Sequence, residues 1–306
     1  MRPYGFDRRP QVRESQLEDE IVDCIFCGSS KLQQTCVAVQ EHPEIRYVKC
    51  AQCFAKFAAR QPTREFLSDL YEPEHYVGTV AGSRYKSARL AQRILPINAT
   101  AALRQHECVK ILDYGGGTGS LGLDLCSLLK TSSCSVTVVD IFERKDNSRI
   151  TFLNPVEFQS LTQDTFDVVV ASAVVEHLKD PNQTLSKLYD VCRPGGHLYF
   201  RVPNLFPLAR VWPPILIYPE HLSDLGPRFW KELPQILGWE VKTVYSRTCQ
   251  TDTLFRESPL ASIVGTSMKI PARVEVWIRN QFNVENPARY ECSGSWEVLF
   301  SKSGNL

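Results

Sequence analysis

The sequence predicts an α/β fold in which helices cover both faces of a parallel sheet, with a small cysteine-rich module in front of it. Three observations lead there. Apolar β-like runs alternate with helix-like stretches from residue 108 onward. A glycine-rich turn joins the first of these runs to the first helix. Two Cys-x-x-Cys pairs lie within residues 24–53.

The strands and helices follow one another in a regular order. Residues 63–107 have the apolar spacing of helices, and they precede the first strand. Strands are expected at 109–113, 135–140, 150–153, 166–172, 197–202, 240–246 and 296–302, with helices at 120–130, 181–192 and 226–237. The early strands are almost continuously apolar, which indicates burial on both faces and hence a parallel sheet.

The glycine turn after the first strand is the most informative segment. Asp113 ends the strand, and glycines follow at 115, 117 and 119 before Ser120 opens a helix. A strand, a glycine turn and a helix N-terminus form a cradle for a nucleotide-sized ligand. The dinucleotide pattern would require a sixth-position glycine at 120. The turn therefore fits a cofactor whose amino-acid tail lies where a pyrophosphate otherwise would.

Asp140 ends the second strand, 27 residues after Asp113. An acid at this position lies beside the glycine turn, at the carboxyl ends of the strands where α/β folds bind ligands. Its carboxylate can accept both hydroxyls of a ribose. The alternative is a solvated acid at a strand end.

Several segments occur in the order and spacing of one enzyme family over residues 109–246. They are Leu112-Asp-Tyr-Gly-Gly-Gly-Thr-Gly119, Val139-Asp140, Phe166-Asp-Val-Val-Val170, Glu176-His177-Leu178 and Arg193-Pro-Gly-Gly196. With them the chain resembles the class I S-adenosylmethionine (SAM)-dependent methyltransferases, which implies their Rossmann-like seven-stranded sheet. The resemblance implies that the donor is bound by Asp113, Gly115, Gly117, Gly119, Asp140, Val156, Glu157 and Ala171. In it, Asp140 holds the ribose and Ala171 lies by the sulfonium.

The two cysteine pairs, Cys24–Cys27 and Cys50–Cys53, are separated by 22 residues. Two such knuckles can supply four thiolates to a tetrahedral zinc ion, and four sulfurs leave no open position, so the zinc is expected to be structural. The alternative is two coincidental pairs of buried or redox cysteines. Cys36 lies between the pairs and is the less favoured alternative to one of these four ligands. The remaining cysteines are expected to be core residues: Cys108, Cys126, Cys134, Cys192, Cys249 and Cys292.

Composition narrows the class of protein. The 306 residues carry a net charge of +1, from 35 basic and 34 acidic residues, which argues against a nucleic-acid partner. The N-terminus has no apolar core that could act as a secretion signal, and residues 211–219 are too short and proline-broken to span a membrane. Eleven cysteines without such a signal favour metal ligands and thiols over disulfides. A cytoplasmic protein that does not bind a membrane is expected.

Two histidines stand where a base for methyl transfer is needed. His177 follows the fourth strand, and His221 belongs to Tyr218-Pro-Glu-His221. An imidazole titrates near neutrality, and a carboxylate such as Glu220 can orient it. The alternative for either histidine is packing or capping. The other four histidines, His42, His75, His106 and His197, have no such neighbours and are expected to be structural.

The four-cysteine module, the tyrosine-bearing helical segment, the Glu-His pair and the Tyr-x-Glu-His motif together narrow the resemblance. They are similar to those of the zinc-containing methyltransferases of nucleotide-activated sugars, especially the sugar C-methyltransferases, without the C-terminal α/β domain of those enzymes. The resemblance implies an acceptor site formed by Tyr76, His177, Tyr218, Glu220 and His221. The expected organisation is a zinc-binding module at 1–62, a helical acceptor segment at 63–107 and a methyltransferase domain at 108–306.

The sequence thus predicts an enzyme that moves a methyl group from SAM to a small oxygen-rich acceptor, such as a sugar or sugar nucleotide, at carbon or oxygen. An O-methyltransferase of another secondary metabolite is one alternative. A ribosomal RNA methyltransferase with a zinc module is another, although residues 171–174 lack the Asn/Asp-Pro-Pro-Tyr/Phe loop that grips an exocyclic amine. A third is a non-catalytic relic that docks proteins through its module. The sequence leaves the oligomeric state open.

Overall fold

The computed structural model describes residues 10–72, 83–131, 133–142, 149–210, 213–249 and 294–304, together with single helical positions between 263 and 278. Within this part of the chain, no helix is both long and apolar enough to cross a membrane.

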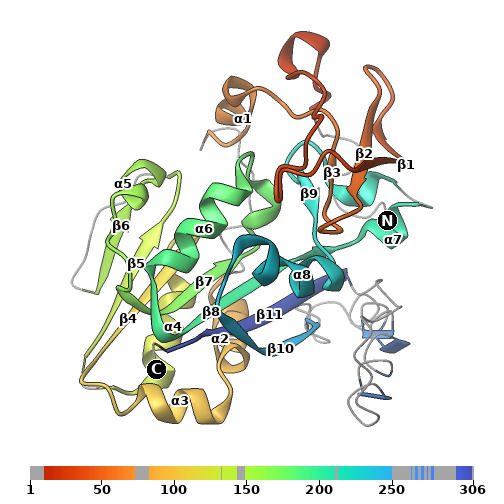
Figure 1. Cartoon of the computed structure of the whole chain (residues 1–306). Coiled ribbons are helices and arrows are strands. Elements are labelled where there is room, and N and C mark those ends of the chain that lie inside the picture. Colours follow the sequence, from red (N-terminus) through yellow and green to blue (C-terminus); the bar gives the residue numbers. More distant parts are fainter. Residues whose placement is uncertain are drawn as a thin grey trace.

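A seven-stranded sheet forms the centre of the molecule (Figure 1). Its strand order is β10-β11-β8-β7-β4-β5-β6. The strands are β4 (Cys108–Tyr114), β5 (Ser133–Val139), β6 (Ile150–Leu153), β7 (Phe166–Ser172), β8 (Cys192–Asn204), β10 (Val241–Thr248) and β11 (Gly294–Lys302). Strands β4 to β8 are parallel, whereas β11 runs antiparallel to both of its neighbours. The predicted α/β class and seven-stranded sheet are confirmed.

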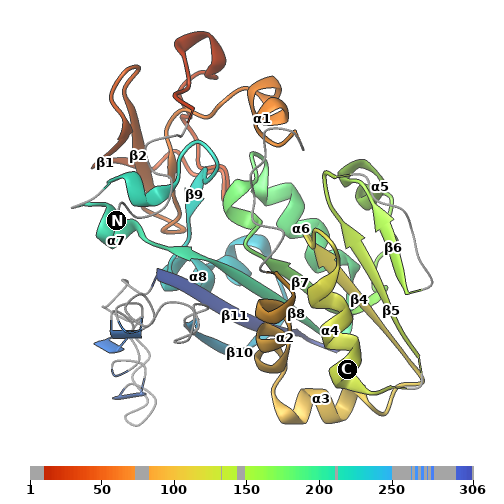
Figure 2. The ribbon, with the colours of Figure 1, turned by 180° about the vertical axis from the view of Figure 1, so that it is seen from behind.

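Helices cover both faces of this sheet, as Figures 1 and 2 show from opposite sides. On one face lie α2 (Ser83–Ile94), α3 (Ile97–Leu103) and α4 (Ser120–Leu129), and on the other α6 (Pro181–Val191) and α8 (Pro227–Leu237). The side chains of β7 alternate between them. Val168 and Val170 pack into the cluster with α2 and α4, whereas Val169 and Ala171 pack into the cluster with α6 and α8. Burial on both faces explains the apolar run in the sequence.

A second, antiparallel sheet lies beside the first and contains the cysteine pairs. We call residues 10–62 the four-cysteine module. Its strands β1 (Leu32–Gln40), β2 (Ile45–Cys50) and β3 (Lys56–Ala58) pair in order, and the sheet is completed by β9 (Ser223–Asp224), which comes from the chain after β8. Phe26 packs edge-on against Phe229 of α8, with ring centroids 4.9 Å apart. The module and the large sheet therefore share one core cluster.

Shorter elements complete the described chain. They are η2 (Glu14–Gln16), α1 (Arg64–Leu70), α5 (Pro155–Gln159), η4 (Val175–His177), α7 (Phe206–Ala209) and η5 (Pro213–Leu216). Strands β6 and β7 have the predicted bounds, but β8 begins at Cys192 instead of residue 197. The Arg-Pro-Gly-Gly segment interrupts its register, since pairing with β7 skips from Cys192 to His197.

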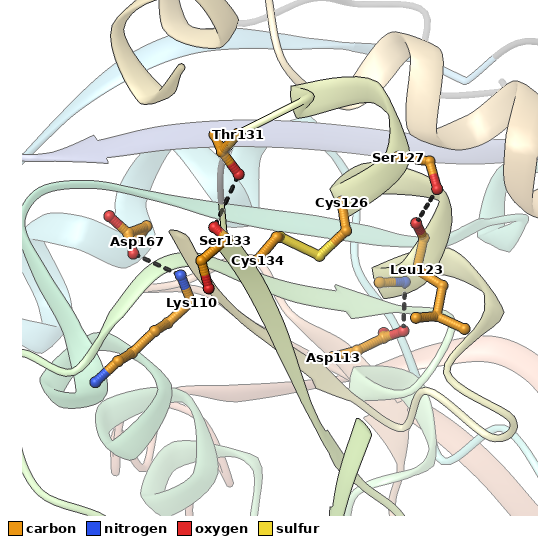
Figure 3. The surroundings of a disulfide bond; sticks show 10 residues. Lys110, Asp113, Leu123, Cys126, Ser127, Thr131, Ser133, Cys134 and Asp167 are labelled. Carbon is orange, nitrogen blue, oxygen red and sulfur yellow. Dashed lines mark hydrogen bonds between the residues drawn. A yellow bond between two sulfur atoms is a disulfide. The ribbon is translucent and has the colours of Figure 1, made fainter. Parts of the chain in front are cut away.

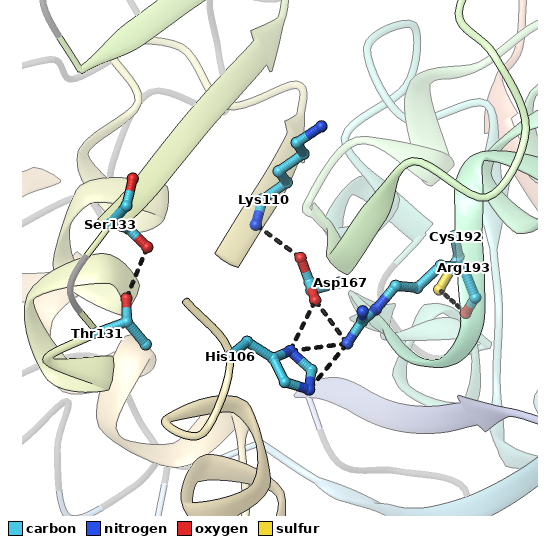
Figure 4. Close-up of polar contacts among 7 residues, drawn as sticks. All are labelled: His106, Lys110, Thr131, Ser133, Asp167, Cys192 and Arg193. Carbon is cyan, nitrogen blue, oxygen red and sulfur yellow. Dashed lines mark hydrogen bonds and ion pairs between the residues drawn. The ribbon is translucent and has the colours of Figure 1, made fainter. Parts of the chain in front are cut away.

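Arg193 of that segment is anchored at the end of the sheet far from the glycine turn (Figure 4). Its guanidinium donates to Oδ1 of the buried Asp167 at 2.7 Å. The same carboxylate contacts His106 Nδ1 at 3.2 Å and accepts the backbone N–H of Lys110 at 2.7 Å. These contacts connect the starts of β4, β7 and β8. The contacts of His106 are therefore structural.

The cysteines of the large domain differ from the prediction. Cys126 of α4 and Cys134 of β5 form a disulfide (Figure 3), so the expectation that they are core thiols was wrong. The packing of α4 on β5 brings their Cα atoms to 5.7 Å, a separation that a disulfide bridges. Cys108 is exposed, again unlike the prediction, because it stands at the open start of β4. Cys192 and Cys249 are buried thiols as expected, and Cys292 lies outside the described residues.

Candidate active site

The glycine turn between β4 and α4 has a backbone that only glycine adopts readily. Gly115, Gly117 and Gly119 all have positive φ angles, of 70°, 56° and 73°. A Cβ on Gly115 would lie 2.6 Å from Val174 Cγ2, so a side chain there would also collide with the segment after β7. The turn thus packs closely against the segment that follows β7.

Asp113 supports this turn from below. Its side chain is 1% exposed, and Oδ2 accepts the N–H of Gly122 in the first turn of α4 at 3.1 Å. Burial raises the pKa of this carboxyl from 3.8 to about 7. Asp113 lines neither of the two cavities at the carboxyl ends of the strands. Its predicted contact with the methionine part of a donor stays a prediction, while the structure gives it a role in holding the turn.

Asp140 lies at the end of β5 beside the turn. One carboxylate oxygen accepts the N–H of Gly117 at 2.8 Å, and the other accepts the N–H of Phe142 at 3.2 Å. Asp140 and Gly115 both line a cavity of about 210 Å³ at the carboxyl ends of the strands. A ligand held here would have the glycine turn on one side and this carboxylate on another, as predicted for a nucleoside-containing donor.

The remaining predicted donor residues do not line this cavity: Gly117, Gly119, Val156, Glu157 and Ala171. Val156 is 81% exposed, and the N–H groups of Val156 and Glu157 both donate to Asn154 Oδ1 at 2.9 Å. Asn154 thereby caps α5, and Pro155 lines the cavity in their place. Ala171 is fully buried within β7. Ala173, two residues on, lines the cavity instead.

His177 stands at the opposite side of the same cavity, after β7. Its Nδ1 lies 2.9 Å from the backbone oxygen of Glu220 and 2.9 Å from the hydroxyl of Tyr71. A carbonyl oxygen only accepts, so a contact this short requires the proton to be on Nδ1. The lone pair of the neutral ring is then on Nε2. Glu220 contributes through its main chain here.

Burial controls the ionisation of the pair that follows β7. It lowers the pKa of His177 to about 4, although the bond to the carbonyl of Glu220 acts in the opposite direction. It raises the pKa of Glu176 to about 8, against the effect of a backbone hydrogen bond and of Arg201. The imidazole is therefore neutral near pH 7 and available as a lone-pair donor.

The Tyr-Pro-Glu-His motif divides between two places. The ring of His221 lies edge-on to that of His177, with centroids 4.8 Å apart. Tyr218 instead points into the module: it is 5% exposed, and its hydroxyl donates to the backbone oxygen of Arg60 at 3.3 Å. Tyr218 therefore lies away from the cavity wall, and its predicted acceptor role stays a prediction. Tyr76 lies outside the described residues.

A larger cavity, of about 720 Å³, adjoins the first. Seven residues line both: Tyr71, Tyr114, Ile141, Phe142, Pro155, His177 and Leu178. The larger space extends over α1 and the start of α6, where Arg64 pairs with Asp180 at 2.6 Å. His177 and Tyr71 thus stand on the wall between a small cavity at the glycine turn and a larger space beside it.

The sequence matches a known protein family. A family model described as a methyltransferase domain matches residues 74–244, which is more than half of the chain. The chain belongs to this methyltransferase family. The predicted class I SAM-dependent methyltransferase domain is thereby confirmed, and the family implies SAM as the donor.

Two curated relatives are similar to this methyltransferase. A malonyl-[acyl-carrier protein] O-methyltransferase of Paenibacillus sp. (strain JDR-2) is 30% identical over 193 residues, or 56% of this chain and 66% of that protein. The mitochondrial ubiquinone biosynthesis O-methyltransferase of Homo sapiens is 29% identical over 133 residues, or 39% of this chain and 35% of that protein. The matches thus span less than two thirds of either relative. A SAM-dependent methyltransferase structure from Archaeoglobus fulgidus aligns with 78% of this chain and all of its own, at 20% identity and a TM-score of 0.43.

The residues present fit the donor that the family implies. Gly115 of the turn lines the smaller cavity, and nothing lies within 4 Å of a Cβ placed on Gly117. Asp140 presents carboxylate oxygens to the same space. These residues would hold the amino-acid and ribose portions, respectively. When bound, SAM supplies an electrophilic methyl group, and the protein has to position an acceptor in line with it.

The four cysteines of the module gather in one place. Cys24 Sγ lies 3.4 Å from Cys53 Sγ, and Cys27 Sγ lies 3.6 Å from Cys50 Sγ. All four sulfurs are within 4.8 Å of one another. The backbone N–H groups of Gln52 and Cys53 point at Cys50 Sγ, at 3.4 and 3.5 Å. The arrangement suits one tetrahedral metal ion.

Tyr71 is a site residue that the sequence did not single out. It lies just after α1, and its hydroxyl contacts both His177 Nδ1 and the backbone oxygen of Glu220, the latter at 3.4 Å. The one signal in the sequence was its place among the tyrosines of the segment before the first central strand. Nothing in that segment distinguishes Tyr71 from Tyr76 without knowledge of which one reaches His177.

Proposed function

We propose that this methyltransferase transfers a methyl group from SAM to a small oxygen-rich acceptor that occupies the larger cavity beside His177. The observation that supports this most strongly is the wall that the two cavities share. A donor bound between the glycine turn and Asp140 would lie next to the space that His177 and Tyr71 border. The lone pair on His177 Nε2 is suited to assist loss of a proton from an acceptor hydroxyl.

Oxygen is the first candidate for the methylated atom. Both curated relatives are named as O-methyltransferases, one of malonyl-[acyl-carrier protein] and one of ubiquinone biosynthesis. Sugars and sugar nucleotides remain the first acceptor class to test, because the Tyr-x-Glu-His motif and the four-cysteine module resemble those of sugar methyltransferases. The 720 Å³ of the larger cavity is enough for a monosaccharide or an aromatic ring of similar size.

We further propose that the four cysteines hold one structural zinc ion. Four thiolates satisfy zinc completely and leave no position for a substrate. The ion would fix the two knuckles and, through β3 and β9, the segment that carries His221.

The first experiment measures donor binding by calorimetry with SAM and its demethylated product on zinc-loaded protein. We expect binding in the micromolar range, and a loss of about 30-fold or more for Asp140→Ala, because a charged hydrogen-bond acceptor contributes about 2 kcal/mol or more. The matched control is Asp180→Asn, which removes an acid from the larger cavity. Absence of binding in the folded wild type would refute the proposal.

The second experiment identifies the acceptor with methyl-labelled SAM. Sugar nucleotides, hydroxylated aromatic compounds and ribosomal RNA fragments form its three arms. Label transferred to a small hydroxyl compound supports the proposal, and label transferred to RNA alone would replace it with the nucleic-acid alternative.

A further inference from the structure

Three side chains that can each bind a metal ion meet behind the cavity wall: Glu176, His177 and His221, of which His177 lines both cavities. One ligand atom from each lies within 4.8 Å of the others. The three come from two segments, η4 and the loop before β9, which the backbone bond from Leu222 N–H to Glu176 O joins at 2.8 Å. This cluster is separate from the four cysteines.

The carboxylate of Glu176 gives an independent sign of a missing partner. Its side chain is 1% exposed, and within the described part of the chain its Oε2 has no hydrogen-bond partner. A buried carboxylate oxygen that nothing satisfies is costly, and a bound cation removes that cost. Oε1 lies 4.0 Å from His177 Nε2, so the carboxylate is directed toward the imidazoles.

The orientation of His177 suits a metal ligand as well as a base. Its Nδ1 is held by the backbone oxygen of Glu220 at 2.9 Å, which leaves the lone pair of Nε2 on the side of Glu176. Metal-binding histidines are commonly fixed in this way, with the second ring nitrogen donating to a carbonyl or carboxylate.

We propose that Glu176, His177 and His221 bind one divalent transition-metal ion, on which the acceptor's oxygen atoms complete the coordination. Two imidazoles and one carboxylate are a known ligand set for such ions, and three protein ligands leave positions open. Ligand atoms about 2.1 Å from one zinc ion lie roughly 3 to 3.5 Å apart. Rotations of the three side chains would therefore have to bring their ligand atoms from within 4.8 Å of one another to this separation.

This inference rests on the proposed methyl transfer and names its acceptor class more narrowly. The ion would lower the pKa of a coordinated acceptor hydroxyl, whose proton would pass to solvent. That oxygen would then attack the methyl carbon of SAM, with the new O–C bond forming as the C–S bond breaks and the electron pair going to sulfur. With open positions side by side, an acceptor with two neighbouring oxygens, such as a vicinal diol or a catechol, binds best. His177 then acts as a ligand in place of taking the proton itself.

The test titrates Mn²⁺ into protein loaded with one zinc ion per chain, which the four thiolates hold, followed by electron paramagnetic resonance and calorimetry. Mn²⁺ prefers carboxylate and imidazole over thiolate, so it reports on this cluster and not on the cysteines. We expect one saturable Mn²⁺ per chain, with affinity at least about tenfold weaker in Glu176→Gln and in His221→Ala. Asp164→Asn, which removes an exposed carboxylate that pairs with Lys302 away from both cavities, should stay within about twofold.

Binding of the demethylated donor is measured on every variant, which shows that each one is folded. His221→Ala provides the second reading if the buried substitution Glu176→Gln does not fold. Wild type without saturable Mn²⁺ binding, or variants with unchanged affinity, would overturn the metal site. Methyl transfer that persists after chelator treatment would overturn it too and leave the proposed function intact. Loss of donor binding in the wild type would instead refute that function.

Discussion

The donor side and the acceptor side of the site are assembled in different ways. On the donor side, Asp113, the glycine turn and Asp140 all belong to one strand–helix–strand unit of 28 residues, 113–140. On the acceptor side, His177 meets Tyr71, which is 106 residues away in sequence, and the carbonyl of Glu220, which is 43 residues away. The first side depends on local backbone geometry, and the second depends on how distant segments pack.

The four-cysteine module accounts for much of the second arrangement. Tyr47 of β2 donates its hydroxyl to the backbone oxygen of His221 at 2.8 Å, and Ala58 N–H donates to Leu222 O at 2.9 Å. No such bonds from the module reach the glycine turn among the described residues. We therefore expect disturbance of the module to affect the acceptor side and to spare donor binding.

His177→Ala should have the largest effect on this comparison. Turnover with the identified acceptor should fall by about 1,000-fold, whether the ring acts as a base or as a metal ligand, while affinity for the demethylated donor changes less than about threefold. Labelled-donor turnover and calorimetry on one preparation measure both. Unchanged turnover would remove His177 from the acceptor side.

Removal of zinc tests whether the four-cysteine module stabilises the acceptor side and not the donor side. The zinc ion is removed with a reagent that modifies the cysteine thiolates. The amides of His221 and Leu222 should then exchange hydrogen about 100-fold faster, because their segment loses its contacts with β2 and β3. The amide of Gly122 on the donor side should keep its protection. Mass-spectrometric hydrogen exchange resolves both peptides, and equal loss on both sides would contradict the comparison.

Asp113 allows a pH test of the donor side. Burial raises its folded-state pKa from 3.8 to about 7, so the stabilisation is complete below about pH 4 and is lost as the pH rises towards 7. Relative to Asp113→Asn, the wild type should lose up to about 1.4 kcal/mol of unfolding free energy per pH unit in that window. Denaturant unfolding between pH 4.5 and 8 measures the slope. Parallel curves for the two proteins would show that the carboxyl is already ionised.

Tyr47→Phe should have the smallest effect. It removes one hydrogen bond to the His221 carbonyl and should cost about 1 kcal/mol of stability. Tyr245→Phe is the matched control, because its hydroxyl makes the same kind of bond to Ile94 O at 2.8 Å, far from the acceptor side. Both variants should lose similar stability, but only Tyr47→Phe should speed exchange at residues 217–222.

These differences explain which features the sequence could predict. The central strands, the glycine turn and Asp140 follow from patterns with a fixed local period, and β6 and β7 were predicted to the residue. Neither Tyr71 nor Glu176 was predicted as a site residue, because their role depends on burial and on contacts with the segment around residue 220. Tyr218 illustrates the same limit: the motif predicted one cluster, but packing against Arg60 turns this tyrosine into the module.

The disulfide shows where composition misleads. The number of cysteines and the composition of the sequence led us to expect thiols, yet Cys126 and Cys134 are bonded because a helix and the next strand bring them together. Their separation of eight residues contained no pattern that predicted the pairing.

Strand β9 has a practical consequence for anyone who wishes to exchange modules between related enzymes. The smaller sheet draws its fourth strand from residues 223–224, and the preceding Tyr218 is buried against it. In a chimera joined at residue 62, β3 of one parent would therefore have to pair with β9 of the other. A graft of the four-cysteine module should therefore include the segment from Ile217 to Leu225 of the same parent, so that all four strands of the smaller sheet come from one protein.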